Sequence, residues 1–133
     1  MSLSPSRRRA LRAGFLFVPL TVALLAAACV PQTILPADCD APSVTRQATL
    51  VGERLSPEQT DICRGQGVQF EITVDAAGVL HLHGYDDEAP AQAVEAGQTV
   101  TLAFAATRAG QFHIEFHGAT ADMEIGILTV HER

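Results

Sequence analysis

Apolar and polar residues alternate strictly in several short segments of this chain. Residues 68–74 place four apolar side chains on one face and three polar ones on the other. The same period recurs at 100–104 and 112–117, and a turn glycine, Gly97 or Gly110, precedes each of these segments. Because successive side chains of a strand point to opposite faces, this period predicts strands with one buried face.

Weaker strand candidates lie at 48–51, 79–85 and 125–130, and no segment has a convincing helical period. The candidate for a single turn of helix is the segment 89–95. Six short strands separated by glycine-containing turns predict an all-β fold, a β-sandwich or a barrel. A domain of about 90 residues buries one core and little more.

The first 28 residues have the layout of a cleavable export signal. The basic residues come first, as Arg7, Arg8, Arg9 and Arg12. An apolar run over 15–25 follows, and three alanines then precede Cys29. The apolar run is too short for a stable membrane-spanning helix, which needs about 20 apolar residues. We therefore predict that residues 1–28 are a signal peptide.

The Ala-Ala-Ala-Cys sequence that ends this segment resembles the lipobox of bacterial lipoproteins, although Ala26 stands where leucine is usual. It predicts that Cys29 is lipidated and that the protein is a membrane-anchored lipoprotein on the extracytoplasmic side of the cell envelope, in the periplasm or at the cell surface. The alternative is an ordinary secretory signal cut nearby, which leaves Cys29 as a free thiol. Residues 6–12 also resemble a twin-arginine signal, so both export routes stay open.

The mature chain divides into a short tether and one domain. Residues 29–44 carry Pro31, Pro36 and Pro42 without a sustained period, which is typical of a flexible tether. Residues 45–133 form the predicted domain.

Cysteine usage predicts one disulfide. With Cys29 consumed by lipid, two cysteines remain, Cys39 and Cys63, in an oxidising compartment. Their bridge would close a loop of about 24 residues and contribute on the order of 3 kcal/mol.

The charge balance narrows the class of partner. Four of the nine basic residues lie in the signal and all fifteen acidic residues follow it, so the mature chain has five basic and fifteen acidic side chains, a formal net charge of −10. This charge argues against nucleic acid and anionic lipid surfaces and favours metal cations or basic proteins. Solubility alone is the simpler explanation.

Four of the five histidines fall in two clusters, His81 with His83 and His113 with His117. Residues two apart share a face of a strand, so each pair projects together, with Glu115 beside the second pair. Imidazole is the commonest metal ligand in proteins. The alternatives are histidines hydrogen-bonded within the sheet and, for the second cluster, a plain solvent-exposed polar face.

Three segments, 79–86, 94–97 and 110–117, together resemble cupredoxin-like domains of bacterial envelope proteins, and the resemblance runs from about Thr49 to the C-terminus. It implies a Greek-key β-sandwich of the cupredoxin type. It also implies copper as the cofactor, with one ligand on a strand in the middle of the chain and the others on the last hairpin. His81 falls where the first copper histidine sits.

The sequence departs from the family at the last hairpin. Phe116 occupies the position of the ligand cysteine, and Ala119 and Glu124 occupy those of the second histidine and the methionine. A blue copper centre needs a cysteine thiolate, so we do not expect one. The remaining candidates suit Cu(II) or Zn(II), and they are His81, His83 and His117, with Met123 or His113 as possible additional ligands.

Polar residues next to the first histidine cluster have two interpretations. The run 86–88 is a solvated acidic loop or a source of a hydrogen-bond acceptor for a metal-binding imidazole. Tyr85 is a core or corner residue, or it serves as such an acceptor through its hydroxyl.

Together these observations predict a lipid-anchored cupredoxin-like protein that binds copper, or another transition metal, for metal handling in the envelope. The alternative is a metal-free cupredoxin-like interaction module, or an accessory domain of an envelope or iron-uptake complex, with an envelope protein as its partner. We expect no enzymatic activity, because the chain offers no paired nucleophile and base and no glycine-rich phosphate loop.

Overall fold

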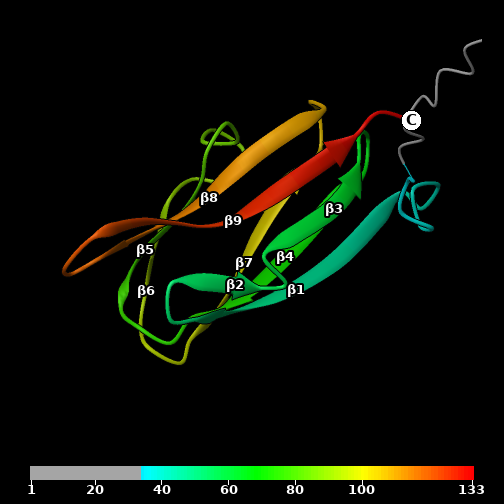
Figure 1. Ribbon diagram of the computed structural model, residues 1–133. Helices are drawn as coiled ribbons and strands as arrows, with labels where there is room; N and C mark the ends of the chain where they lie inside the picture. Colours follow the sequence, from blue (N-terminus) through cyan, green and yellow to red (C-terminus); the bar gives the residue numbers. More distant parts are fainter. Residues whose placement is uncertain (1–33) are drawn as a thin grey trace, which may run out of the picture. The chain divides into compact units, whose positions relative to one another are not determined.

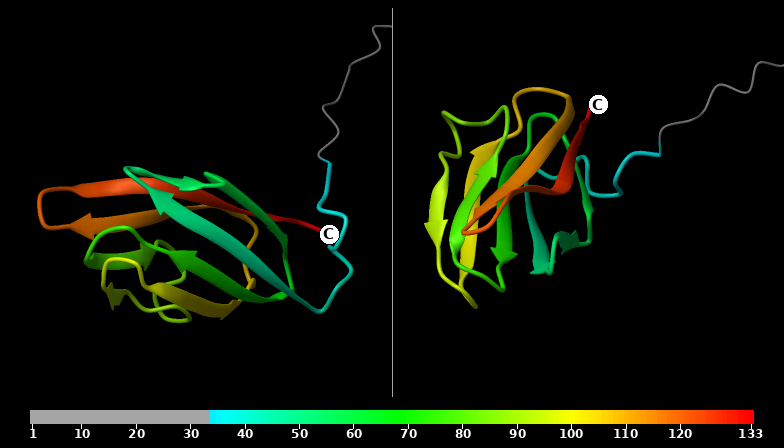
Figure 2. Two further views of the ribbon diagram at one scale, coloured as in Figure 1. Left: turned by 90° about the horizontal axis from the view of Figure 1, so that it is seen from below. Right: turned by 60° about the vertical axis from the view of Figure 1, so that its left-hand side comes forward.

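The computed structural model describes residues 34–133, and they form a β-sandwich of nine strands (Figure 1). None of these residues belongs to a helix that could span a bilayer. The first sheet has the order β2-β1-β4-β7 and the second the order β3-β9-β8-β5-β6; Figure 2 shows the two layers from other directions. The strands are β1 (Ser43–Val51), β2 (Arg54–Ser56), β3 (Gln59–Cys63), β4 (Gly67–Thr73), β5 (Gly78–Leu82), β6 (Gln92–Val94), β7 (Thr99–Ala105), β8 (Gly110–Gly118) and β9 (Asp122–His131).

The core lies between the sheets and consists of the apolar positions of the alternating segments. Phe70 and Ile72 of β4 face inward from the first sheet, and Ile114 and Phe116 of β8 face inward from the second. Their polar neighbours consequently point outward, because alternate residues of a strand lie on opposite faces. The predicted all-β sandwich is confirmed.

Two details of the predicted elements are wrong. Residues 92–94 form strand β6 instead of a turn of helix, and the helix-like turn comes earlier, where the Ala89 N–H donates to the Tyr85 carbonyl at 2.7 Å. The strand expected at 79–85 ends at Leu82, because the chain turns at Gly84, whose φ is +84°.

The segment before β1 is fastened to the domain. The predicted disulfide between Cys39 and Cys63 is present. The buried Gln66 amide accepts from the Cys63 N–H at 2.8 Å and donates to the Asp38 carbonyl at 2.7 Å. β1 starts at Ser43, two residues before the predicted domain boundary. The signal peptide, Cys29 and the first part of the tether lie outside the described residues.

An ion pair between Asp38 and Arg46 also fastens the segment before β1 to the domain, and its contribution to stability depends on pH. Both Asp38 oxygens accept hydrogen bonds from the Arg46 guanidinium, at 2.8 and 2.9 Å, which holds the pKa of Asp38 below its usual value of 3.8. A carboxyl group whose pKa is lower in the folded than in the unfolded state stabilises the fold at pH values above its unfolded-state pKa. The contribution of Asp38 to the free energy of unfolding is therefore lost progressively as the pH falls below about 4. We expect Asp38→Asn to be less stable than the wild type at pH 7, and we expect this difference to shrink as the pH falls below about 4, as measured by urea unfolding. The control is the exposed Asp40→Asn, for which a pH-dependent difference of the same size would contradict this role.

Candidate metal centre

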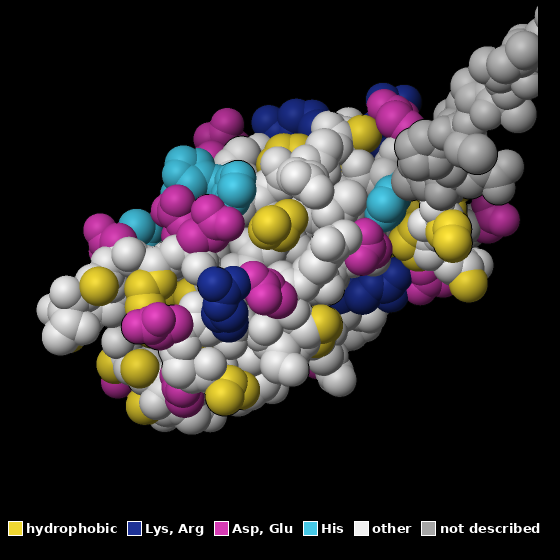
Figure 3. All heavy atoms as spheres, in the orientation of Figure 1, with side chains coloured by type: hydrophobic (Ala, Val, Ile, Leu, Met, Phe, Trp, Pro, Cys, Tyr) yellow, Lys and Arg dark blue, Asp and Glu magenta, His cyan; other side chains and the backbone are white. Residues whose placement is uncertain are grey.

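A group of histidines and carboxylates lies on the outer face of the second sheet, where β5 and β8 pair. Leu80 and Leu82 of β5 point into the core, so His81 between them points outward. His81 stands directly opposite Glu115 of β8. His117 lies two residues further along β8 on the same face. Figure 3 shows histidine and acidic side chains gathered in one patch of this surface.

Glu115 is the point at which the three predicted metal residues meet. Its Oε2 lies 3.9 Å from His81 Nδ1 and 3.6 Å from His117 Nε2, and its Oε1 lies 3.6 Å from His83 Nε2. These separations are longer than hydrogen bonds. Ligand atoms held about 2.0–2.2 Å from one metal ion are themselves roughly 3 Å apart, so small side-chain movements would seat an ion among them.

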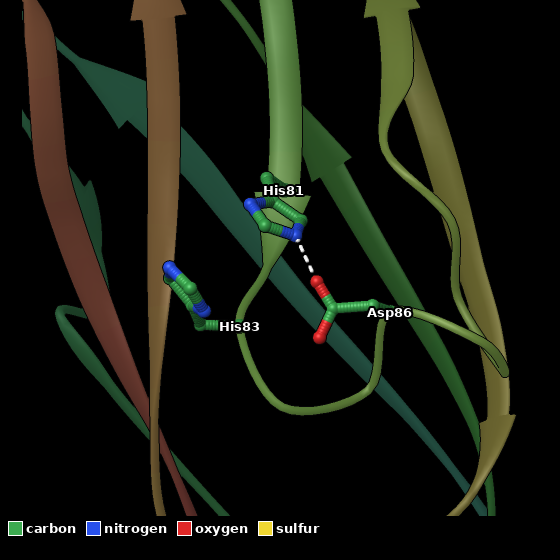
Figure 4. A group of neighbouring side chains, drawn as sticks. All are labelled: His81, His83 and Asp86. Atoms are coloured by element: carbon green, nitrogen blue, oxygen red, sulfur yellow. Dashed lines mark hydrogen bonds and ion pairs between the residues drawn. The ribbon is translucent and has the colours of Figure 1, made fainter.

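A second carboxylate approaches His81 from the loop after β5 (Figure 4). Asp86 Oδ1 lies 2.5 Å from His81 Nε2, and Asp86 Oδ2 accepts the Gly84 N–H at 3.0 Å. The hydrogen bond with His81 holds the pKa of Asp86 below its usual value of 3.8, and the Gly84 N–H acts in the same direction. The carboxylate is therefore ionised at neutral pH and offers a charged oxygen beside the imidazole.

Two groups of three side chains have the spacing of metal ligands. One ligand atom from each of His81, His83 and Asp86 lies within 4.8 Å of the other two, and the same holds for His81, Glu115 and His117. The second group is the less exposed one: the side chains of Glu115 and His117 are 28% and 36% exposed, whereas those of His83 and Asp86 are both 56% exposed. Each group offers two imidazoles and one carboxylate.

The other two predicted ligands lie elsewhere. His113 is exposed, and its Nδ1 pairs with Glu124 at 2.9 Å, outside both groups. Met123 stands opposite Phe116 and packs against the core, so it faces away from the histidines. The structure therefore does not bring Met123, a possible additional ligand, to this face.

Tyr85 is a core residue, which agrees with the first of the two interpretations of its sequence position. It is fully buried, and its hydroxyl donates to the Arg108 carbonyl at 2.9 Å and accepts from the Arg108 N–H at 3.2 Å. The hydroxyl therefore anchors the loop that carries Asp86 and does not bond a metal-binding imidazole.

Glu115 is a candidate ligand that the sequence analysis left out of the predicted ligand set. Glu115 lies two residues from both His113 and His117, and alternate residues of a strand share one face of the sheet. The sequence therefore already places Glu115 on the same face as these two histidines. The sequence places Asp86 in a loop as a possible hydrogen-bond acceptor, and the approach of its carboxylate to His81 depends on the tight turn at Gly84.

Gly84 permits this return, and replacing it provides a test. A Cβ atom there would lie 2.8 Å from the Phe112 ring, and the positive φ disfavours any other residue. We expect Gly84→Ala to lower the free energy of unfolding by about 1–3 kcal/mol in chemical denaturation. The control is Gly97→Ala, which has a similar φ of +80° but open space around the Cβ. Equal losses in the two variants would mean that the Phe112 contact has no cost.

Comparison with known proteins adds the type of fold. The sequence matches no protein-family model, and no curated protein matches it. Among solved structures, the chain is similar to a copper binding protein in the apo form, with a TM-score of 0.54, 12% identity, and coverage of 68% of this chain and 89% of that one. A multicopper oxidase (TM-score 0.54) and the blue copper oxidase from Nitrosomonas europaea (0.52) each match at 18% identity over 68% of this chain. The fold is of the cupredoxin type. This chain spans only 39% of the length of either oxidase.

The cupredoxin fold carries an unusual donor set here. Phe116 is buried, and within residues 34–133 both cysteines belong to the disulfide, so the described part of the chain has no thiolate. The available donors are imidazole nitrogens and carboxylate oxygens. Such a set fits Cu(II) or Zn(II) and does not fit a blue copper centre.

Proposed function

We propose that this protein binds a copper ion at the outer face of its cupredoxin domain and takes part in metal handling or supply in the cell envelope. The ligands are His81, Glu115 and His117, with His83 at the edge. The observation that carries the proposal is the position of Glu115, which faces all three histidines at 3.6–3.9 Å. The copper named in the descriptions of the similar structures favours copper over zinc.

The ligand chemistry agrees with a carrier. Imidazole and carboxylate donors suit the tetragonal geometry of Cu(II). The donors stand on a partly exposed sheet face, so solvent or another protein reaches the ion easily. A site of this kind exchanges its metal, whereas a closed site retains it. The absence of enzymatic activity stays a prediction.

The membrane attachment is a further part of the proposal and rests on the N-terminal sequence. Lipid on Cys29 would hold the domain at a membrane on the extracytoplasmic side. Mass spectrometry of the N-terminal peptide tests it: a diacylglyceryl mass on Cys29 supports the anchor. Cleavage elsewhere with an unmodified Cys29 would leave an exported soluble protein.

Metal binding is tested by titration calorimetry on the soluble mature chain, defined as residues 29–133 with Cys29→Ser. We expect one equivalent of Cu(II) to bind with a submicromolar Kd, and Zn(II) and anaerobic Cu(I) to bind more weakly. The double variant His81→Ala/His117→Ala should lose at least about 100-fold in affinity.

The matched control removes a histidine outside the centre. His131 pairs with Asp61 at 2.7 Å and belongs to neither ligand group, so His131→Ala should bind copper like the wild type. Weak binding that is indifferent to His81 and His117 would instead favour the metal-free interaction module.

A further inference from the structure

We infer that the metal face has two overlapping positions for one cation, which share His81 and are filled one at a time. This inference rests on the proposed function. The inner position is formed by His81, Glu115 and His117, and the outer position by His81, His83 and Asp86.

The two ring nitrogens of His81 face different carboxylates. Nε2 lies 2.5 Å from Asp86 Oδ1, and Nδ1 lies 3.9 Å from Glu115 Oε2. Figure 4 shows His83 and Asp86 on the loop that follows β5, on either side of the His81 ring. The imidazole therefore stands between the two positions and presents one nitrogen to each.

The chemistry of a neutral imidazole makes the positions exclusive. One ring nitrogen carries the proton and donates it, and only the other has a lone pair for a metal. When Nε2–H donates to Asp86, Nδ1 is free for an ion at the inner position. When the Glu115 side chain moves from 3.9 Å into hydrogen-bond range and accepts the Nδ1–H, Nε2 is free for an ion at the outer position. Each carboxylate is thus a ligand in one state and orients the ring in the other.

The outer position is more exposed to solvent than the inner one, so the two positions have different roles in metal uptake. The outer position includes the side chains of His83 and Asp86, both 56% exposed, whereas Glu115 and His117 of the inner position are 28% and 36% exposed. An ion arriving from solvent or from a partner meets the outer position first. When the ion moves from Nε2 to Nδ1 at the inner position, Nδ1 gives its proton to solvent and Nε2 takes up one proton from solvent, so the ring stays neutral.

The test is Cu(II) electron paramagnetic resonance on the soluble mature chain at half an equivalent of copper, together with the stoichiometry at saturation. We expect two spectral components in the wild type and one bound ion per chain. His83→Ala/Asp86→Asn should keep only the inner component, Glu115→Gln/His117→Ala only the outer one, and His81→Ala neither. Asparagine and glutamine keep an oxygen that accepts the ring N–H, and circular dichroism of the metal-free variants checks that each is folded.

Other results separate this inference from the proposed function. A single wild-type component that His83→Ala/Asp86→Asn leaves unchanged would mean one position only, with copper binding intact. Two ions per chain would overturn exclusive filling. If the wild type binds no copper, the proposed function fails and the inference fails with it.

Discussion

Cu(II) at a hundred times its dissociation constant is expected to raise the free energy of unfolding of the soluble mature chain by about 2.7 kcal/mol. A ligand that binds only the folded state stabilises it by mass action, and the ligands of this centre come from β5, β8 and the loop after β5, which are brought together only by folding. For a domain of this size the gain corresponds to an increase in Tm of about 10–20 °C. Differential scanning calorimetry with and without the metal measures it.

The control for this result is His81→Ala. His81 belongs to both ligand groups, so its loss should abolish the copper-dependent increase and leave the metal-free Tm within a few degrees of the wild type. An increase of the same size in the variant would show that copper stabilises the domain through other residues, and the proposed centre would be wrong.

Replacing Tyr85 by alanine is expected to lower the free energy of unfolding by about 3–5 kcal/mol. The Tyr85 ring is fully buried. Its centroid lies 4.8 Å from the ring centroid of Phe104, 4.7 Å from that of Phe112 and 4.6 Å from the guanidinium carbon of Arg108. Removing it leaves a cavity and deprives the Arg108 backbone of both hydrogen bonds to the hydroxyl. Since a domain of this size has a total stability of about 5–15 kcal/mol, this is a large fraction.

Urea unfolding measures the effect, and Tyr85→Phe keeps the prediction testable if the alanine variant does not fold. The phenylalanine variant retains the ring and loses only the hydrogen bonds, so we expect a loss of about 1–3 kcal/mol. A phenylalanine variant as stable as the wild type would mean that solvent replaces the hydroxyl at Arg108.

The strands that the sequence predicts are those with one fully buried face. β4, β7 and β8 have seven to nine residues and alternate over most of their length, so their period is visible without any knowledge of their neighbours. The three strands that were missed, β2, β3 and β6, are all at sheet edges and have three to five residues. β2 and β6 have three residues and are too short to show a period, and in β3 the buried position 60 is a threonine, so apolar and polar residues do not alternate there. These segments become strands because β1, β9 and β5 pair with them.

Part of the candidate site is also predictable from the alternation of apolar and polar residues. The outward direction of His81 and His117 follows from the apolar residues beside them in the sequence. Met123 lies on the inner face because of an irregularity in the β8–β9 hairpin. Counting alternate residues back from the buried Leu128 puts Met123 on the outer face, but the register shifts between Ile114 and Glu115 and reverses the phase. A β-bulge of this kind depends on tertiary pairing and leaves no regular mark in the sequence.

The disulfide described above also determines how the domain bears mechanical load. A pull on the chain at residue 34 reaches Cys39 before it reaches β1, and the covalent bond passes the tension to Cys63 at the end of β3. Cys63 pairs with His131 of β9, so the tension is distributed into the five-stranded sheet and the β1–β4 ladder is not unzipped from its end. Force applied from the N-terminal side therefore enters the domain at Cys63, and the first sheet is not pulled from the β1 end as long as the bridge is oxidised.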